Sequence, residues 1–193
     1  MRALVACECS GEIRDALIAV GVDAISCDLK PTRKPGPHYQ GDVRDILGDS
    51  WDLLIAHPVC KYLTNAGVRW LHERPERWEL MRQGAEFFLL FENAKHIPKR
   101  AIENPIMHKY GLEIIGLKAT QFVQPWMFGD PFQKATGWWL YGLPKLVATH
   151  KKSDYLEIKQ ECWLMSPGPE REELRSKTYP GHAGAVATQW GRI

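Results

Sequence analysis

Short apolar segments alternate with helical patterns along the first half of the chain, and this alternation constrains the fold more than any other feature. Residues 3–7 form an apolar run that ends before Gly11, and apolar residues recur at helical spacing over 12–20. Residues 23–28 predict a second strand, followed by a loop rich in proline and glycine over 31–41. This order of strand, helix and strand predicts a βαβ unit and therefore a parallel sheet.

The middle of the chain repeats this alternation. Residues 51–56 form an apolar run typical of a strand that is buried on both faces of a parallel sheet. The run stops at Pro58, because proline cannot continue a central ladder. Apolar residues at helical spacing predict a long helix over 76–93, and residues 100–103 predict a short strand that is broken by Pro105. This order implies a second crossover of the βα type.

The last third of the chain has a different order of elements. The segments 120–126 and 134–140 are predicted as neighbouring strands joined through a turn at 129–131, which favours antiparallel pairing. A helix of small residues is expected over 181–190. We therefore predict an α/β fold with a doubly wound, mostly parallel sheet and an antiparallel strand near the C-terminal end.

Length and charge place the chain among ordinary globular proteins. Its 193 residues fit a single domain, 1–193, and no apolar run approaches the roughly 20 residues that span a bilayer. Lysine and arginine (25) barely exceed aspartate and glutamate (23), so no bulk basic field indicates nucleic acid. The first residues predict a strand and not a secretory signal, so we expect a cytoplasmic protein without membrane attachment. The oligomeric state stays open.

The cysteines predict neither a disulfide framework nor a metal site. Five cysteines are an odd number in a chain large enough to fold without disulfide bonds, so thiols are expected. Cys7 and Cys9 are separated by one residue, and no matching second pair follows them, so we expect no metal.

Most residues that could bind a ligand or take part in a reaction follow a predicted strand. Ligands of a doubly wound sheet bind beyond the carboxyl ends of its strands, so these residues are expected at one edge. They are Cys7, Glu8, Cys9, Ser10, Gly11, Asp28, His57, Pro58, Val59, Cys60, Glu103, Asn104 and Pro105.

The first of these strand ends predict a cofactor that contains a nucleoside. Ser10 and Gly11 open a helix, where backbone can approach a ligand closely, although a purely structural turn fits them equally well. Asp28 ends the second strand, where a carboxylate commonly accepts hydrogen bonds from ribose hydroxyls. Asp42 is placed to accept from an adenine amino group beside the apolar Val43, and it is also a candidate helix N-cap.

The later strand ends supply a nucleophile and an acid. Cys60 lies on a loop three residues beyond a buried strand, and a thiolate is a strong nucleophile, although a buried inert thiol is the alternative. Glu103 offers a carboxyl group to a ring nitrogen, with Asn104 beside it to fix the loop. A raised pKa of Glu103 would suit a proton donor, and a structural salt bridge is the alternative.

Taken in order, these residues resemble the C5-cytosine DNA methyltransferases, particularly the compact phage-type members. Residues 58–67, Pro-Val-Cys-Lys-Tyr-Leu-Thr-Asn-Ala-Gly, are similar to the nucleophile loop of that family, and residues 103–105 to its Glu-Asn-Val motif. Asp28 and residues 41–43 stand where the family has its ribose-binding acid and its adenine contact. Residues 10–11 take the place of its glycine-rich loop.

The resemblance implies a Rossmann-like methyltransferase fold, S-adenosyl-L-methionine as methyl donor and DNA as partner. Cys60 would add to C6 of a flipped cytosine, and Glu103 would engage N3. Lys134 would replace the cation of the Gln-x-Arg-x-Arg motif of the family. The implied catalytic set is Cys60, Glu103, Asn104 and Lys134, and the implied cofactor set is Glu8, Cys9, Ser10, Gly11, Asp28, Leu29, Asp42, Val43, His57 and Pro58.

Other functions remain open. Residues 141–178 form only a reduced insert where full-length members carry a recognition domain, so a free pyrimidine nucleotide or RNA is an alternative substrate. Val59, in place of the usual proline, and the lone Lys134 favour a second alternative, a catalytically reduced partner protein that binds a nucleoside. The tryptophans at 126, 138 and 139 are expected in the core, with stacking on exposed bases as the alternative.

Overall fold

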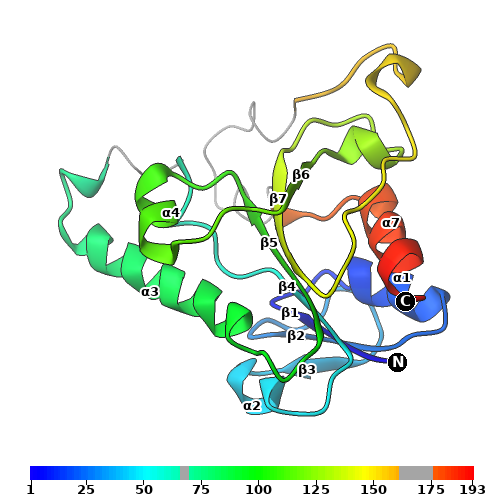
Figure 1. The fold of residues 1–193 in the computed structure, drawn as a ribbon, viewed down its shortest axis with the longest axis horizontal. Helices are drawn as coiled ribbons and strands as arrows, with labels where there is room; N and C mark the ends of the chain where they lie inside the picture. The colour runs from blue at the N-terminus through cyan, green and yellow to red at the C-terminus, as the bar shows by residue number, and fades with distance from the viewer. Residues whose placement is uncertain (66–69, 161–175) are drawn as a thin grey trace.

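The computed structural model describes residues 1–65, 70–160 and 176–193. One seven-stranded sheet organises them, with the strand order β3-β2-β1-β4-β5-β7-β6 (Figure 1). The pairs β3-β2, β2-β1, β1-β4 and β4-β5 are parallel, whereas β7 is antiparallel to both β5 and β6. The predicted α/β fold class is therefore confirmed. The strands are β1 Arg2–Ala6, β2 Asp23–Asp28, β3 His38–Gln40, β4 Leu53–Ala56, β5 Lys99–Pro105, β6 Gln121–Val123 and β7 Thr136–Tyr141.

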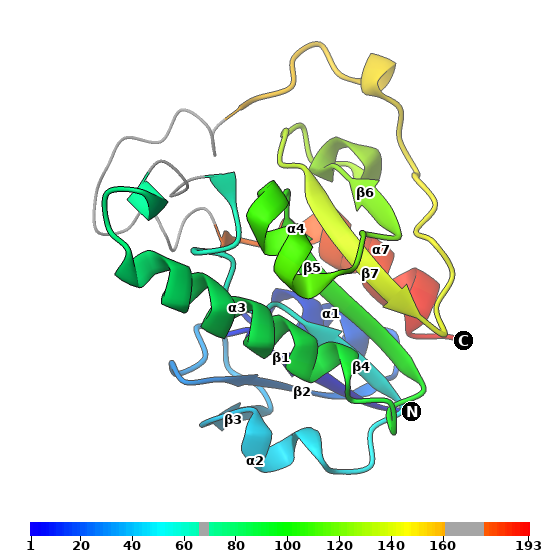
Figure 2. The same ribbon diagram turned by 60° about the vertical axis from the view of Figure 1, so that its left-hand side comes forward.

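Helices cover both faces of this sheet. Helices α1 and α7 pack together on one face, and α2, α3 and α4 cover the other (Figures 1 and 2). The helices are α1 Glu12–Ala19, α2 Arg44–Leu47, α3 Glu76–Glu92, α4 Lys109–Ile115 and α7 Pro180–Trp190, with short 3-10 helices η2 Pro125–Phe128 and η3 Lys152–Asp154.

Residues that alternate along β4 fill the two cores. Leu53 and Ile55 contact the core beside α1 and α7, whereas Leu54 and Ala56 contact the core beside α3. All four side chains are fully buried, as the uninterrupted apolar run predicts. Because both faces of β4 are apolar, the first polar side chain after its start, His57, follows the last residue of the strand.

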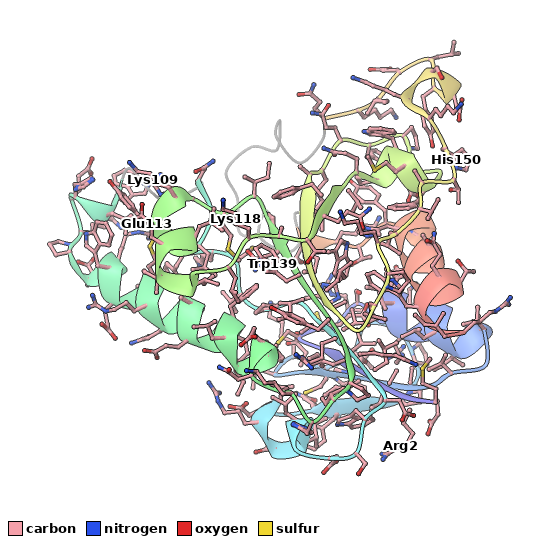
Figure 3. All side chains as sticks on the ribbon, viewed as in Figure 1. Arg2, Lys109, Glu113, Lys118, Trp139 and His150 are labelled. Carbon is pink, nitrogen blue, oxygen red and sulfur yellow. The ribbon has the colours of Figure 1, made fainter. Side chains whose placement is uncertain are left out.

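Neighbouring tryptophans of β7 also point to opposite cores. Trp138 packs edge-on against Trp190 of α7 at a centroid distance of 5.2 Å. Trp139 packs edge-on against Phe88 of α3 at 5.0 Å and lies in the middle of the molecule (Figure 3). Both rings are buried, which confirms the prediction of core positions. Trp126 lies in η2 and is half-buried.

Three elements differ from the expectation. Residues 31–41, predicted as a loop, contain β3, which pairs with β2 from Ser26 opposite His38. Strand β5 continues through Pro105, where it pairs with β7 but has already passed the end of β4, so the proline removes no hydrogen bond to that strand. Helix α4, which was not predicted, follows β5 directly and begins after the cap residue His108.

The structure can be compared with three further expectations, which concern membrane spans, disulfide bonds and the insert. None of the helices among the described residues is long and apolar enough to cross a membrane. The cysteines at 7, 9, 27 and 60 form no disulfide within the described part of the chain, and Cys162 lies outside it. The reduced insert at 141–178 includes residues 161–175, which also lie outside the described residues, so this division of the chain stays a prediction.

A buried arginine joins α1 to the loop that precedes β3. The side chain of Arg14 is fully buried, and its guanidinium donates to Asp15, to the hydroxyls of Ser26 and Thr32, and to two carbonyls of the loop. A Cβ atom at Gly36 would lie 2.7 Å from this guanidinium, so the loop needs a glycine there. Arg14 therefore holds the loop in place by charge-assisted hydrogen bonds.

Replacing Arg14 tests this account. Arg14→Met should lower the free energy of unfolding by about 3 kcal/mol or more, because the loop carbonyls and buried hydroxyls lose their donor. Urea unfolding would measure the change. Arg82→Met is the control, since Arg82 is exposed and pairs with Glu79 one turn away, and it should change stability little. Equal effects of the two substitutions would contradict the role of Arg14.

Candidate functional site at the carboxyl edge of the sheet

The candidate site lies where the direction of strand addition reverses, between β1 and β4. The chain adds β2 and β3 on one side of β1, and then β4 and β5 on the other. The backbone amide of His57 donates to the carbonyl of Ala6 at 2.9 Å, so β1 and β4 remain hydrogen-bonded up to this edge of the sheet. Cys7 follows with a φ of 59°, a left-handed conformation that is uncommon outside glycine and turns the chain sharply. Such a point is the usual ligand site of an open α/β sheet.

The first loop binds the N-terminus of α1 with its own side chains. The buried carboxylate of Glu8 accepts from the backbone amides of Ile13 at 2.8 Å and Arg14 at 3.3 Å. The Ser10 hydroxyl accepts from the amide of Glu12 at 3.3 Å and donates to Glu8. The backbone amides of Glu12, Ile13 and Arg14 are therefore already occupied by Glu8 and Ser10.

The predicted nucleoside contacts lie beyond β2 and β3. One carboxylate oxygen of Asp28 accepts from the amide of Lys30 at 2.9 Å, and Leu29 beside it is 74% exposed. Asp42 accepts from the amide and the guanidinium of Arg44, both at 2.9 Å, and these hydrogen bonds hold the pKa of Asp42 below its usual value. Val43 is buried beneath them. This edge therefore presents two carboxylates and an exposed apolar side chain.

Three thiols near these carboxylates stay protonated. Burial raises the pKa of Cys7 most strongly, and the charge of Asp28 adds to the effect. Burial and Asp28 also raise the pKa of Cys9, and they raise that of Cys27 to about 11. The thiolate is the nucleophilic form, so these three cysteines are poorly suited to attack. Among the described cysteines, this leaves Cys60 as the candidate nucleophile.

The loop that carries Cys60 is fixed at both ends to the segment that follows Glu103. The side-chain amide of Asn104 donates to the carbonyl of Pro58 at 3.1 Å. Farther along, Thr64 forms a bridge with Met107, and the carbonyl of Leu63 accepts from the backbone amide of residue 108 at 2.7 Å. Between these points Cys60 is half-buried in a tight turn. Residues 66 and 67 of the predicted nucleophile loop lie outside the described residues.

A histidine and a glutamate pair at the ends of β4 and β5. Ala56 lies opposite Ile102, so the next residues, His57 and Glu103, lie side by side. His57 Nδ1 and Glu103 Oε2 are 3.1 Å apart, and both side chains are largely buried. Burial raises the pKa of Glu103, but the hydrogen bond to His57 and the charges of His57 and Lys134 outweigh it, so that pKa lies below its ordinary value. The raised pKa considered from the sequence is therefore not found.

This pair lines a narrow hollow beside α7. Lys134 also lies on its wall, where its ammonium donates to the carbonyl of Lys177 at 2.8 Å. Cys60 is not among the lining residues. The structure thus brings Glu103, Lys134 and His57 together and places Cys60 on the adjoining loop. The wall consists of Ile13, His57, Glu103, Pro125, Lys134, Thr136, Trp138, Ser176, Lys177, Thr178, Tyr179 and His182.

A second histidine of the hollow is held neutral. Burial lowers the pKa of His182 to about 4. Its Nε2 atom accepts from the indole N–H of Trp138 at 3.2 Å, and its ring stacks on Phe128. The backbone amide of His182 donates to Asp130, which joins the start of α7 to the residue after η2. His182 therefore fixes the wall of the hollow rather than offering its Nε2 atom to a ligand.

Sequence reasoning missed two parts of this arrangement. His57 was assigned to the cofactor, an assignment that stays a prediction, and its pairing with Glu103 requires the register of β4 and β5. His182 lies in the helix expected over 181–190, but the sequence carries no signal for its hydrogen bond with Trp138, because that contact exists only in the folded core. No group of three or more potential metal ligands gathers among the described residues.

No family model matches the sequence, and no curated protein matches it. Among solved structures, a methyltransferase of Entamoeba histolytica, EhMeth, is similar at 13% identity and a TM-score of 0.49, over 86% of this chain and 63% of that one. A DNMT2 variant of Spodoptera frugiperda is similar at 12% identity and a TM-score of 0.35, over 78% and 53%. This chain thus spans less than two thirds of either protein. Likeness at this level says nothing about substrate.

The buried His182 predicts a specific dependence of stability on pH. Its pKa is lower in the folded than in the unfolded chain, so the unfolded chain binds more protons between about 4 and 6.5. Stability should therefore fall as the pH decreases through this window, by up to about 3 kcal/mol from this group. His182→Gln keeps an acceptor for Trp138 but does not titrate, and it should flatten this part of the curve in urea unfolding. The exposed His72→Gln is the control, and an equal flattening there would refute the assignment.

Proposed function

We propose that the protein transfers a methyl group from S-adenosylmethionine to C5 of cytosine in DNA through a covalent adduct with Cys60. The contact of Asn104 with the Pro58 carbonyl carries this proposal, because it joins the nucleophile loop to the strand that bears Glu103. A nucleophile, a carboxylate and the Lys134 cation are the groups that a C5 methylation needs around a pyrimidine.

The residues at the ends of β1 and β2 favour a cationic methyl donor over a dinucleotide as the cofactor. Dinucleotide sites place a pyrophosphate at the first helix N-terminus, but here the carboxylate of Glu8 already binds those amides. Asp28 adds further negative charge nearby, which would repel phosphates and attract a sulfonium, whereas Asp42 is paired with Arg44. Asp28 has the position to accept from ribose hydroxyls, and Leu29 offers apolar surface to an adenine ring. S-adenosylmethionine would supply an electrophilic methyl group at this edge.

The residues of the hollow and its adjoining loop would then have separate roles. The thiolate of Cys60 adds to C6 of the base, and the electron pair of the C5–C6 double bond becomes available at C5. Lys134 would stabilise the negative charge that develops toward O2. Glu103, ionised in its surroundings, would accept a hydrogen bond from the N4 amino group of the base. The electron pair at C5 would take the methyl group, and the donor would leave as the neutral thioether. A solvent base would then remove the C5 proton, and Cys60 would leave C6 as a thiolate while the C5–C6 double bond forms again.

The nature of the substrate is the least constrained part of the proposal. A reduced insert at 141–178 would also suit a free pyrimidine nucleotide or RNA. Separate incubations with DNA, RNA and nucleotide pools and labelled S-adenosylmethionine distinguish these substrates. A nucleoside-binding partner without catalysis, the second alternative, would transfer no label to any of them.

Cys60→Ser tests the nucleophile. Wild type should form a covalent adduct with an oligonucleotide that contains 5-fluorocytosine in the presence of S-adenosylmethionine, visible by intact mass. Cys60→Ser should form none, and its methyl transfer should fall at least about a thousandfold, because a hydroxyl is a far weaker nucleophile here. Cys27→Ser is the matched control and should behave as wild type, because Cys27 is a buried thiol that donates to the Gly41 carbonyl and a serine hydroxyl can do the same. Transfer at the wild-type rate by Cys60→Ser would exclude the covalent mechanism.

Glu103→Gln tests the carboxylate. The substitution keeps the size of the side chain but removes its charge, so single-turnover methyl transfer should fall by roughly 10² to 10⁴. Glu113→Gln, at an exposed position on α4, is the control (Figure 3). A loss of less than about threefold in Glu103→Gln would remove Glu103 from the site.

A further inference from the structure

An exposed aromatic side chain lies on β6, the short strand at the edge of the sheet beside β7 (Figure 2). Phe122 is the middle residue of this strand, and 56% of its surface is exposed. Among the described residues it is the only aromatic one that is exposed to this degree; the other exposed large hydrophobic side chains are aliphatic. Phenylalanine is usually buried, so its place on the surface calls for a partner outside the chain.

A glycine of the next strand positions this ring. Phe122 lies opposite Gly137 of β7. A Cβ atom at Gly137 would lie 3.1 Å from Phe122 Cε1 and 3.2 Å from the ring of Trp139. The phenyl ring therefore reaches over the bare backbone of β7 towards β5, and a side chain at residue 137 would block it. The ring is held in place although much of it faces solvent.

This ring lies on the face of the sheet where the nucleophile loop begins. Gly137 pairs with Phe122 on one side and with Asn104 on the other. Directly paired residues project from the same face, so the side chains of Phe122 and Asn104 share that face. Two strand spacings separate their Cα atoms, which is about 10 Å. Because Asn104 binds the Pro58 carbonyl, Phe122 lies close to the start of the loop that carries Cys60.

The charges around Phe122 favour a polyanion. The segments that border this face are 58–65, 106–120 and 133–137. Their one acidic residue is Glu113, which lies on α4, farther from β7 than Lys118 in Figure 3. Lysine can neutralise a phosphate of a nucleic acid backbone. The lysines of these segments are Lys61, Lys109, Lys118 and Lys134.

We propose that Phe122 stacks on the base next to the target base in single-stranded DNA. This inference rests on the proposed function, in which Cys60 reacts with the target cytosine. Every base offers a π face, so an aromatic platform binds a neighbouring base without reading the sequence. The base must be free of its own neighbours in a duplex to meet the ring. The lysines would meet the phosphates on either side, and a free nucleotide would gain nothing from Phe122.

Three variants separate stacking from a general effect on the fold. Phe122→Ala removes the ring, whereas Phe122→Trp keeps an aromatic surface and is the rescue variant. Val147→Ala is the control, because Val147 is 70% exposed and its backbone is bound by the side chain of Gln189 on α7, across the sheet from Phe122.

The experiment compares three ligands that share one cytosine. They are a trinucleotide with adenine on both sides of the cytosine, the same trinucleotide with abasic sites in place of the adenines, and deoxycytidine monophosphate. Affinities are measured by titration calorimetry without a methyl donor. Wild type should bind the adenine-flanked form most tightly. Phe122→Ala should weaken that complex roughly tenfold and leave the other two unchanged. Phe122→Trp and Val147→Ala should keep the wild-type order.

The outcomes distinguish this inference from the proposed function. If the adenine-flanked form shows the expected loss in Phe122→Ala, but wild type forms no adduct with a 5-fluorocytosine oligonucleotide, the covalent mechanism fails and the stacking role stands. Equal losses for all three ligands overturn the stacking role, and so does equal binding of the flanked and abasic forms by wild type. A dimer that dissociates in Phe122→Ala, with unchanged binding of the trinucleotide, overturns it in favour of a second copy of the chain.

Discussion

The hydrogen bond from the Asn104 side chain to the Pro58 carbonyl is the contact on which the candidate site depends. Pro58 is the second residue after β4, and Asn104 is buried near the end of β5, so this bond sets how the chain leaves the sheet. Residues alternate between the faces of a strand, so Asn104 and Glu103 point to opposite sides. The same short segment therefore anchors the nucleophile loop on one side and presents a carboxylate to the hollow on the other.

Charge divides the edge into two regions with different chemistry. Around Asp28 the thiols of Cys7 and Cys27 are buried, and the neighbouring carboxylates add to the effect of burial in raising their pKa. Around Glu103 the surroundings contain Lys134 and His57, and the pKa of the carboxyl group falls. A cationic donor suits the first region, and a base that gains negative charge suits the second. The fold keeps both regions adjacent because β1 and β4 are neighbours.

Sequence patterns predicted the elements whose stability is local or strongly apolar, and missed those created by tertiary contacts. Strand β4 was clear because residues 53–56 are buried on both faces. Strand β3 was missed because His38, Tyr39 and Gln40 have no apolar period, and they are extended only through pairing with β2. The role of Glu8 was unpredictable for a related reason. A carboxylate near a helix start binds either a ligand or the helix itself, and only the fold decides.

The place of Lys134 bears on the energetic cost of binding a base under the proposed function. Its ammonium donates to the carbonyl of Lys177, in the segment that leads to α7. A ligand oxygen that takes this ammonium exchanges one hydrogen bond for another, and the net free energy of such an exchange is small. In such an exchange Lys134 contributes orientation rather than affinity.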